Sequence, residues 1–219
     1  MAIEAFPNVE LADEYGLLAI GGDLEVESLL LAYQSGIFPW PMSEIDEIPW
    51  FSPPERALIF FSELKISKSL AKRRKKCGFN FKIDADFEKV IGECRASKTR
   101  KEVGQSWITD EMESAYLALH RAGHAHCVAC YNKEEQLVGG IYGVSINGMF
   151  AGESMFYHEP DASKLSLWYL IEHLQSKGAT WLDCQQLTPL VEKFGAKEIP
   201  RSQFLKLLDE ALDQQISLF

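Results

Sequence analysis

Apolar residues recur at helical spacing in four segments of the chain. The first, near the start of the chain, is stopped by Gly36, and the last spans about residues 201–213. Between them, residues 108–123 have Thr109 as the expected N-cap, carry acids in the first turn and end at Gly123. Residues 162–178 carry an amphipathic stripe of leucine and isoleucine. These patterns predict four helices.

Shorter apolar runs with strand character fill much of the second half of the chain. They are residues 126–131, 136–146, 149–157 and 180–187. An Asn-Gly pair at residues 147–148 separates two of them and is a strong signal for a two-residue hairpin turn. With such a turn, Ile146 faces Met149. The same register places Tyr142 opposite Glu153.

In chain order, an antiparallel meander is followed by a helix, a parallel strand and a second helix. This order is acyltransferase-like, so we expect an α/β (α+β) fold with a GNAT-type mixed sheet flanked by helices. Prolines cluster in residues 48–61, where they break helices and interrupt sheets. We therefore expect a small N-terminal domain in residues 1–60 and an acyltransferase-like catalytic domain in residues 61–219.

The composition narrows the class of protein. With 47% hydrophobic residues the chain is globular and not disordered. No apolar run approaches the roughly 18 residues that span a membrane, and the acidic start of the chain does not look like a signal peptide. Five scattered cysteines suit free thiols better than a disulfide framework. We therefore expect a cytoplasmic protein that is not held at a membrane.

Charge is distributed unevenly along the chain. The chain has 22 basic and 32 acidic residues, a formal net charge of −10, yet residues 64–83 contain eight lysines or arginines and no acid. Overall acidity argues against non-specific coating of nucleic acid, but screening over about 8 Å allows a local basic patch to hold phosphates. The run is therefore either a solvated helix face or a phosphate-binding surface.

Polar side chains within the predicted strands are the strongest candidates for chemistry. Asp183 and Gln185 lie two residues apart, so both project from the same face of their strand. Glu153 and Met155 are expected to share a face in the same way. A buried carboxylate beside an amide is costly unless both groups are paired. The Asp183–Gln185 pair either fixes the strand by a hydrogen bond or holds an amine nucleophile and steers its proton.

Other kinds of site are poorly supported by the sequence. Histidines and cysteines gather in residues 120–130, but Cys127 and Cys130 are three apart on a strand and point to opposite faces, which argues against zinc. The chain lacks a P-loop and a Gly-x-Ser-x-Gly nucleophile elbow. We expect neither a metal nor a cofactor. Three tryptophans have two possible roles, packing in the core or stacking on a base, namely Trp40, Trp50 and Trp107.

Ten short stretches form an ordered set across nearly the whole chain. They are GLLAIGGDL (16–24), AYQSGIFPW (32–40), WFSPPERAL (50–58), SWIT (106–109), AYLALHRAGHAH (115–126), LVGGIYGV (137–144), FAGESMF (150–156), ASK (162–164), LDCQ (182–185) and GAKEIPR (195–201). Each stretch alone is weak. Together they resemble the leucyl/phenylalanyl-tRNA–protein transferase family of bacteria.

This resemblance implies a cytosolic, monomeric enzyme that moves Leu or Phe, and also Met, from aminoacyl-tRNA onto an N-terminal Lys or Arg. The acceptor protein is thereby marked for degradation as an N-degron. The donor is an activated ester, so neither ATP nor a covalent enzyme intermediate is needed. Alternatives are a peptidoglycan-type aminoacyl-tRNA transferase, a non-catalytic RNA-binding module and a coenzyme-A-dependent N-acetyltransferase, although the last would need a glycine-rich pyrophosphate loop.

Carried over residue by residue, the resemblance places the catalytic pair on Asp183 and Gln185. Gln185 would position the attacking amine, while Asp183 orients it and accepts or stabilises its proton. Glu153, together with the general acidity of the chain, would favour an acceptor that begins with Lys or Arg.

The resemblance also implies three binding regions. The terminal adenosine is implied to lie at Trp40 and Trp107, with Tyr33 and Tyr116 nearby. The pocket for the donor side chain is implied to consist of Ile141, Phe150, Met155, Leu167 and Leu174, with Glu153 beside it. The acceptor arm of the tRNA is implied to contact the basic run, at Lys68, Lys72, Arg73, Arg74, Lys75 and Lys76.

Overall fold

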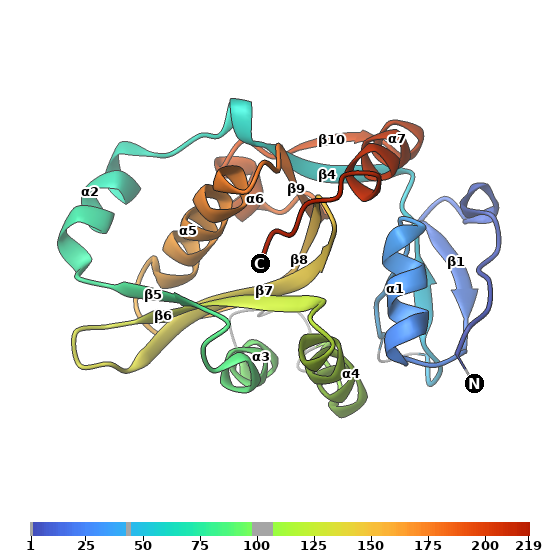
Figure 1. Cartoon of the computed structure of the whole chain (residues 1–219), viewed down its shortest axis with the longest axis horizontal. Helices are drawn as coiled ribbons and strands as arrows, with labels where there is room; N and C mark the ends of the chain where they lie inside the picture. Colours follow the sequence, from blue (N-terminus) through green and yellow to red (C-terminus); the bar gives the residue numbers. More distant parts are fainter. Residues whose placement is uncertain (1, 43–44, 98–106) are drawn as a thin grey trace.

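The computed structural model of the protein describes residues 2–42, 45–97 and 107–219. Within these residues the strands form two sheets, one of three strands and one of seven (Figure 1). The N-terminal part, with the small sheet, lies at one end of the longest axis of the molecule (Figure 1). Among the described helices, none combines the length and the apolar character that crossing a lipid bilayer requires.

The N-terminal part is built on the three-stranded antiparallel sheet. Its elements are η1 (Val9–Leu11), β1 (Leu17–Ile20), α1 (Val26–Gln34), β2 (Phe38–Pro39) and β3 (Pro49–Phe51). Helix α1 lies beside this sheet (Figure 1) and stops, as predicted, at Gly36, which has a φ of 73°. Glycine adopts this left-handed backbone without steric cost, so the residue type explains where the helix ends.

The seven-stranded sheet contains the predicted meander. In pairing order its strands are β10 (Lys197–Pro200), β4 (Glu55–Phe60), β9 (Trp181–Gln185), β8 (Met149–Tyr157), β7 (Leu137–Ile146), β6 (Ala125–Tyr131) and β5 (Asn80–Ile83). β8 and β9 run parallel, whereas the other neighbours are antiparallel. The strands predicted from the sequence and their order are confirmed. The domain boundary after residue 60 remains a prediction, and β4, just before it, already belongs to this sheet.

Helices cover both faces of the large sheet. After β4 the helical elements are η2 (Phe61–Glu63), α2 (Lys68–Cys77), α3 (Phe87–Ala96), α4 (Asp110–Arg121), α5 (Ala162–Ser176), α6 (Pro189–Lys193) and α7 (Arg201–Leu212). α3 and α4 lie on one side of β7, and α5 lies on the other (Figure 1). α4, α5 and α7 confirm three of the predicted helices. Thr109 caps α4 as predicted, because its hydroxyl accepts a hydrogen bond from the Met112 amide at 3.1 Å.

Two clusters of buried apolar side chains lie between the sheet and the helices that cover it. The first core cluster joins α1, α3, α4 and α7 to one face of the sheet and includes Leu29, Ile91, Leu119, Tyr142 and Phe204. The second core cluster joins α5 to the other face and includes Ile141, Phe150, Leu167 and Leu174. Each of these large apolar side chains contributes about 1.5–3 kcal/mol when it is fully buried, so the two clusters hold the layers together.

The hairpin between β7 and β8 is present at residues 147–148, as predicted. Ile146 pairs with Met149, which confirms the register next to the turn. Asn147 has a φ of 50°, the left-handed conformation that a two-residue hairpin turn requires.

Farther from the turn, the register of this hairpin shifts by one residue. Gly143 pairs with Gly152, but the next residue, Tyr142, pairs with Ser154. Glu153 is therefore the extra residue of a β-bulge, and the prediction that Tyr142 faces Glu153 is wrong. A bulge turns the side chains beyond it relative to regular alternation, and the sequence pattern of period two does not reveal it.

Glycine is required on β7 at this bulge. A Cβ atom built on Gly143 would lie 2.1 Å from the backbone oxygen of Ala151 and 2.6 Å from the ring of Phe150. The opposite residue, Gly152, has more room, because its nearest neighbour would be a backbone oxygen at 3.5 Å.

We expect Gly143→Ala to lower the free energy of unfolding by at least about 2 kcal/mol, because a backbone atom cannot yield to the new methyl group. The matched control, Gly152→Ala, should change it by less than about 1 kcal/mol. Urea denaturation of both variants measures the difference. Equal effects of the two substitutions would contradict the close approach at the bulge.

Candidate active site

The sheet opens between its two parallel strands. Within the described residues, β8 and β9 pair at one position, where Ala151 lies opposite Asp183. Glu153 and Gln185 each follow two residues later, so they lie at equivalent places on the two strands. The Gln185 side-chain amide donates a hydrogen bond to Glu153 Oε1 at 2.8 Å, across the gap between the strands. Parallel strands that separate in this way expose polar groups at their carboxyl ends, where ligands commonly bind.

Gln185 is held in an unusual conformation at this opening. Its φ of 61° lies in the left-handed region, which is uncommon for a residue with a side chain. The Gln185 amide donates a hydrogen bond to Asp183 Oδ1 at 2.8 Å, which fixes this backbone geometry. Strained residues of this kind cluster at functional sites, so the conformation supports the sequence-based choice of Gln185.

Glu153 lies in a cluster of hydroxyl and amide groups and is only 8% exposed. The Tyr33 hydroxyl donates to Glu153 Oε1 at 2.7 Å, and the Tyr116 hydroxyl donates to Oε2 at 3.1 Å. The two tyrosine hydroxyls are themselves 2.5 Å apart. Burial raises the pKa of Glu153 to about 7, although the hydrogen bonds from both tyrosines act to lower it. Burial likewise raises the pKa of Tyr33 and of Tyr116 well above 10, so both hydroxyls stay protonated and can donate.

Asp183 is paired with a buried arginine that sequence reasoning missed. The Arg56 Nε and Nη2 atoms lie 2.9 Å from Oδ1 and 2.7 Å from Oδ2, and each side chain is 2% exposed. The guanidinium of Arg56 lies between the rings of Phe38 and Phe204, 4.5 Å and 4.6 Å from their centroids. The sequence does contain a signal for this ion pair. Arg56 stands at the start of the apolar run ERALIF, and a charge in a buried strand requires an acidic partner.

The aromatic residues assigned to the adenosine lie on the same side of the sheet as Glu153. Trp40 and Trp107 are both partly exposed and pack against the first core cluster, to which Tyr33 and Tyr116 belong. The structure therefore brings these four residues onto one cluster. Trp50, by contrast, is a core residue, since it is 1% exposed and its indole nitrogen donates to the Gly21 carbonyl at 2.8 Å.

The five apolar residues assigned to the donor side chain lie together on the other side of the sheet. Four of them are at most 2% exposed in the second core cluster, namely Ile141, Phe150, Leu167 and Leu174. Met155 is partly buried against the same cluster and pairs with Ile141. Glu153 does not share their face, because the bulge separates it from Met155. The expectation that Glu153 and Met155 share a face is therefore wrong.

The basic run forms helix α2, which presents two kinds of cation. Lys68, Lys72, Lys75 and Lys76 are exposed and follow helical spacing, so they share one face. Arg74 instead turns toward α5, where it makes two hydrogen bonds of 2.6 Å to Glu172 and lies 4.2 Å from the ring centroid of Trp168. Arg73 lies 5.3 Å from the ring centroid of Phe79 and 4.0 Å from Glu159.

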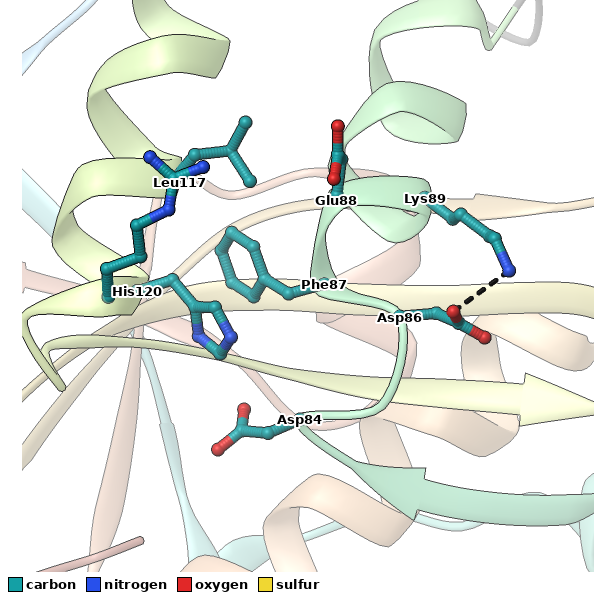
Figure 2. Close-up of a pocket in the computed structure, with 8 residues that line it drawn as sticks. Asp84, Asp86, Phe87, Glu88, Lys89, Leu117 and His120 are labelled. Atoms are coloured by element: carbon teal, nitrogen blue, oxygen red, sulfur yellow. Dashed lines mark ion pairs between the residues drawn. The ribbon is translucent and has the colours of Figure 1, made fainter.

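Two surface hollows contain none of the predicted site residues. One of about 350 Å³ lies beside the start of α3, where Asp84, Asp86 and Lys89 line it together with Phe87 and His120 (Figure 2). Two of its three acids are already bonded within the chain, Asp86 to Lys89 at 2.9 Å (Figure 2) and Asp84 to His126 at 2.7 Å. The other, of about 610 Å³, lies between the starts of α1 and α4 and is lined by Asp23, Glu25, Asp110 and Glu111 among others.

The histidines and cysteines of residues 120–130 do not gather around one point. Cys127 belongs to the first core cluster, whereas Cys130 packs with Val138 and Ala162 in a separate small cluster, so the two thiols lie on opposite faces as predicted. In the part of the chain that the structure describes, no group of three or more His, Cys, Asp or Glu side chains could hold a metal ion.

The order of the strands, and the glutamate–glutamine contact where β8 and β9 separate, define an acyltransferase-like α/β protein. Among solved structures, the crystal structure of FemX is similar to this fold, with a TM-score of 0.52 and 10% sequence identity. The match covers 83% of this chain and 70% of that one.

Comparison of sequences identifies the family. The model of the leucyl/phenylalanyl-tRNA protein transferase matches residues 58–209, and that of its N-terminal domain matches residues 22–54. The leucyl/phenylalanyl-tRNA–protein transferase of Nitrosomonas eutropha is 46% identical over 211 residues, which cover 95% of this chain and 88% of the relative. That of Maridesulfovibrio salexigens is 44% identical over 208 residues, 95% of this chain and 86% of the relative. The chain belongs to this family of aminoacyltransferases, as the resemblance indicated.

We expect the free energy of unfolding of a Glu153→Gln variant to depend on pH less steeply than that of the wild type. Because burial raises the pKa of this carboxyl group from 4.5 to about 7, the folded protein retains a proton that the unfolded chain releases between these values. The free energy of unfolding of the wild type therefore falls as the pH rises through this window, by up to about 3 kcal/mol, and the variant lacks this loss. Urea denaturation at about pH 5 and about pH 8 measures the difference. A difference that is independent of pH would contradict the environment described for Glu153.

Proposed function

We propose that this chain transfers Leu or Phe, and also Met, from aminoacyl-tRNA to the N-terminal Lys or Arg of acceptor proteins. Membership of the family supports the reaction. The single structural observation that carries the proposal is the Gln185–Glu153 contact at the opening between β8 and β9. There an amine can meet an acyl ester between groups that accept and donate hydrogen bonds.

In this proposal Gln185 positions the acceptor amine. Its side-chain nitrogen is engaged by Glu153, so its side-chain oxygen is the atom that remains to accept a hydrogen bond from the amine. Asp183 takes the role of a positioning residue, because its carboxylate is occupied by Arg56 and by the Gln185 backbone amide. This changes the role that the sequence suggested for Asp183, which was direct contact with the amine.

The donor is proposed to bind on both sides of the opening. The terminal adenosine would lie at the partly exposed rings of Trp40 and Trp107, because base stacking needs an accessible aromatic face. The Leu or Phe side chain would enter among Ile141, Phe150, Met155, Leu167 and Leu174, which offer apolar contacts and no charge. Because four of these residues are fully buried without a donor, its entry would require their side chains to move apart.

The preference for a basic acceptor is proposed to arise from the charge of the chain as a whole. The net charge of −10 attracts Lys and Arg, and four acidic residues line the hollow between α1 and α4. Glu153 is too enclosed to be the main source of this preference. The enzyme would act as a monomer in the cytoplasm, and its products would be substrates for degradation.

The direct test is transfer from leucyl-tRNA to a peptide that begins with Arg, detected by the mass increase of one leucine residue. We expect phenylalanyl-tRNA to react detectably and isoleucyl-tRNA poorly, because a β-branched side chain carries bulk next to the reacting ester. A methylene group in an apolar pocket is worth about 1–3 kcal/mol, so discrimination should be graded. A peptide that begins with Ala is the control. Absence of any transfer to the Arg peptide would refute the proposed function.

The exposed lysine face of α2 is proposed to bind the tRNA backbone. Replacing Lys68, Lys72, Lys75 and Lys76 by Ala should weaken tRNA binding and reduce the slope of log K against log salt by about 3 to 4, if each lysine neutralises one phosphate. The control is Arg74→Ala, which removes a contact with α5. It should lower the free energy of unfolding by about 1 kcal/mol and change the slope by at most about 1. An unchanged slope in the lysine variant would show that this face is solvated and does not bind the tRNA backbone.

A further inference from the structure

The two carboxylates at the opening differ in what surrounds them. Asp183 faces the guanidinium of Arg56 at 2.7 Å, so this carboxylate is held in a buried ion pair. Glu153 is bonded instead to two hydroxyl groups and one carboxamide, all of them neutral. Among the described residues, no cation is hydrogen-bonded to Glu153, so a proton can reach or leave this carboxyl group without breaking an ion pair. Two carboxylates in contrasting environments commonly divide the roles in a catalytic site.

Access to the cluster is limited to one edge. Tyr33 is 2% exposed and Tyr116 is 0% exposed, whereas Glu153 and Gln185 are each 8% exposed. A substrate that reaches the cluster therefore meets the glutamate and the glutamine first. Among the described residues, Glu153 Oε2 accepts a hydrogen bond from Tyr116 alone, at 3.1 Å, so this oxygen has an acceptor site left for an amine proton.

We propose that Glu153 is the catalytic acid and base of the transfer, a role that rests on the proposed function. The neutral amine nitrogen attacks the ester carbon, a carbon–nitrogen bond forms, and a proton on nitrogen passes to Glu153 Oε2. The tetrahedral intermediate then collapses, the bond between the carbon and the ribose oxygen breaks, and Glu153 returns the proton to that oxygen. The products are a peptide bond and a free hydroxyl group, and Glu153 is again a carboxylate.

The charged and titratable groups that face Glu153 come from four elements. Tyr33 lies on α1, Tyr116 on α4, Arg56 on β4 and Asp183 on β9. Because burial raises the pKa of Glu153 to about 7, a useful fraction is ionised at neutral pH and its acid form is strong enough to return the proton. The rate of transfer should therefore rise with pH through this pKa and level off above it.

The test is the single-turnover rate of leucine transfer to saturating peptide, measured against pH. The α-amine of the peptide also titrates, at about 7.7–8.0, so two peptides with different α-amine pKa values are compared. The inflection due to the amine moves with the peptide, whereas that due to Glu153 does not. We expect Glu153→Gln to lower the rate by about 10²–10⁴-fold, to remove the fixed inflection and to leave tRNA binding unchanged.

Two further variants keep the test decisive. Tyr116→Phe removes a hydrogen bond that favours the ionised carboxylate, so the fixed inflection should move to higher pH. Asp183→Asn should lower the rate but retain the inflection, because Asp183 acts through the position of Gln185. If Glu153→Gln fails to fold, the shift in Tyr116→Phe decides the matter.

The proposal is overturned if Glu153→Gln keeps both the inflection and a rate within about 10-fold of wild type. It is also overturned if Tyr116→Phe leaves the inflection in place, or if Asp183→Asn is the variant that removes it. A wild-type protein that transfers no leucine refutes the proposed function itself, which is a separate outcome.

Discussion

The ion pair between Arg56 and Asp183 is the constraint on which the arrangement of the molecule depends. Both side chains are buried, and breaking such a pair typically costs about 3–5 kcal/mol because it leaves an uncompensated charge. The pair requires β4 and β9 to be neighbours, and it places the guanidinium against Phe38 of the N-terminal part and Phe204 of α7. Segments far apart in the sequence must therefore assemble together. The N-terminal part is tied to the large sheet at the same point that fixes Gln185.

The opening between β8 and β9 depends on two irregularities that act together. The bulge at Glu153 leaves this side chain facing α1 and α4 while Met155 turns to the other face, and the left-handed backbone at Gln185 brings its amide to meet Glu153. Each irregularity has its own support: Gly143 leaves room for the bulge, and Asp183 holds the backbone of Gln185.

Much of the fold follows from the sequence because local signals agree with the final structure. The caps of α4, the stop at Gly36 and the hairpin at residues 147–148 are all local effects, and all are confirmed. Strand β5 and helix α3, in residues 80–96, were not predicted, because their sequences show no comparable capping or turn signal. Register shifts could not be predicted, because a bulge is set by how the two strands twist and pack. For the same reason the sequence pattern placed Glu153 and Met155 on one face, whereas the bulge separates them.

The candidate site was predictable in its residue types but not in its internal connections. Asp183 and Gln185 stood out as polar residues in an apolar strand, and the structure places them at the opening. Arg56 was missed because its partner lies more than a hundred residues away. The sequence also could not separate the lysines of α2 from Arg74, whose role depends on a contact with α5. Pairing over long distances is the information that a single sequence lacks.

The lysine face of α2 gives the molecule an electric dipole moment along its longest axis. α2 lies at one end of that axis, and the N-terminal part lies at the other (Figure 1). Residues 1–60 contain 11 acids and a single arginine, so the two ends are oppositely charged. Near a polyanion such a molecule experiences a torque that turns α2 toward it before any contact forms. Orientation during approach raises the association rate, and this gain is lost as salt shortens the range of the field.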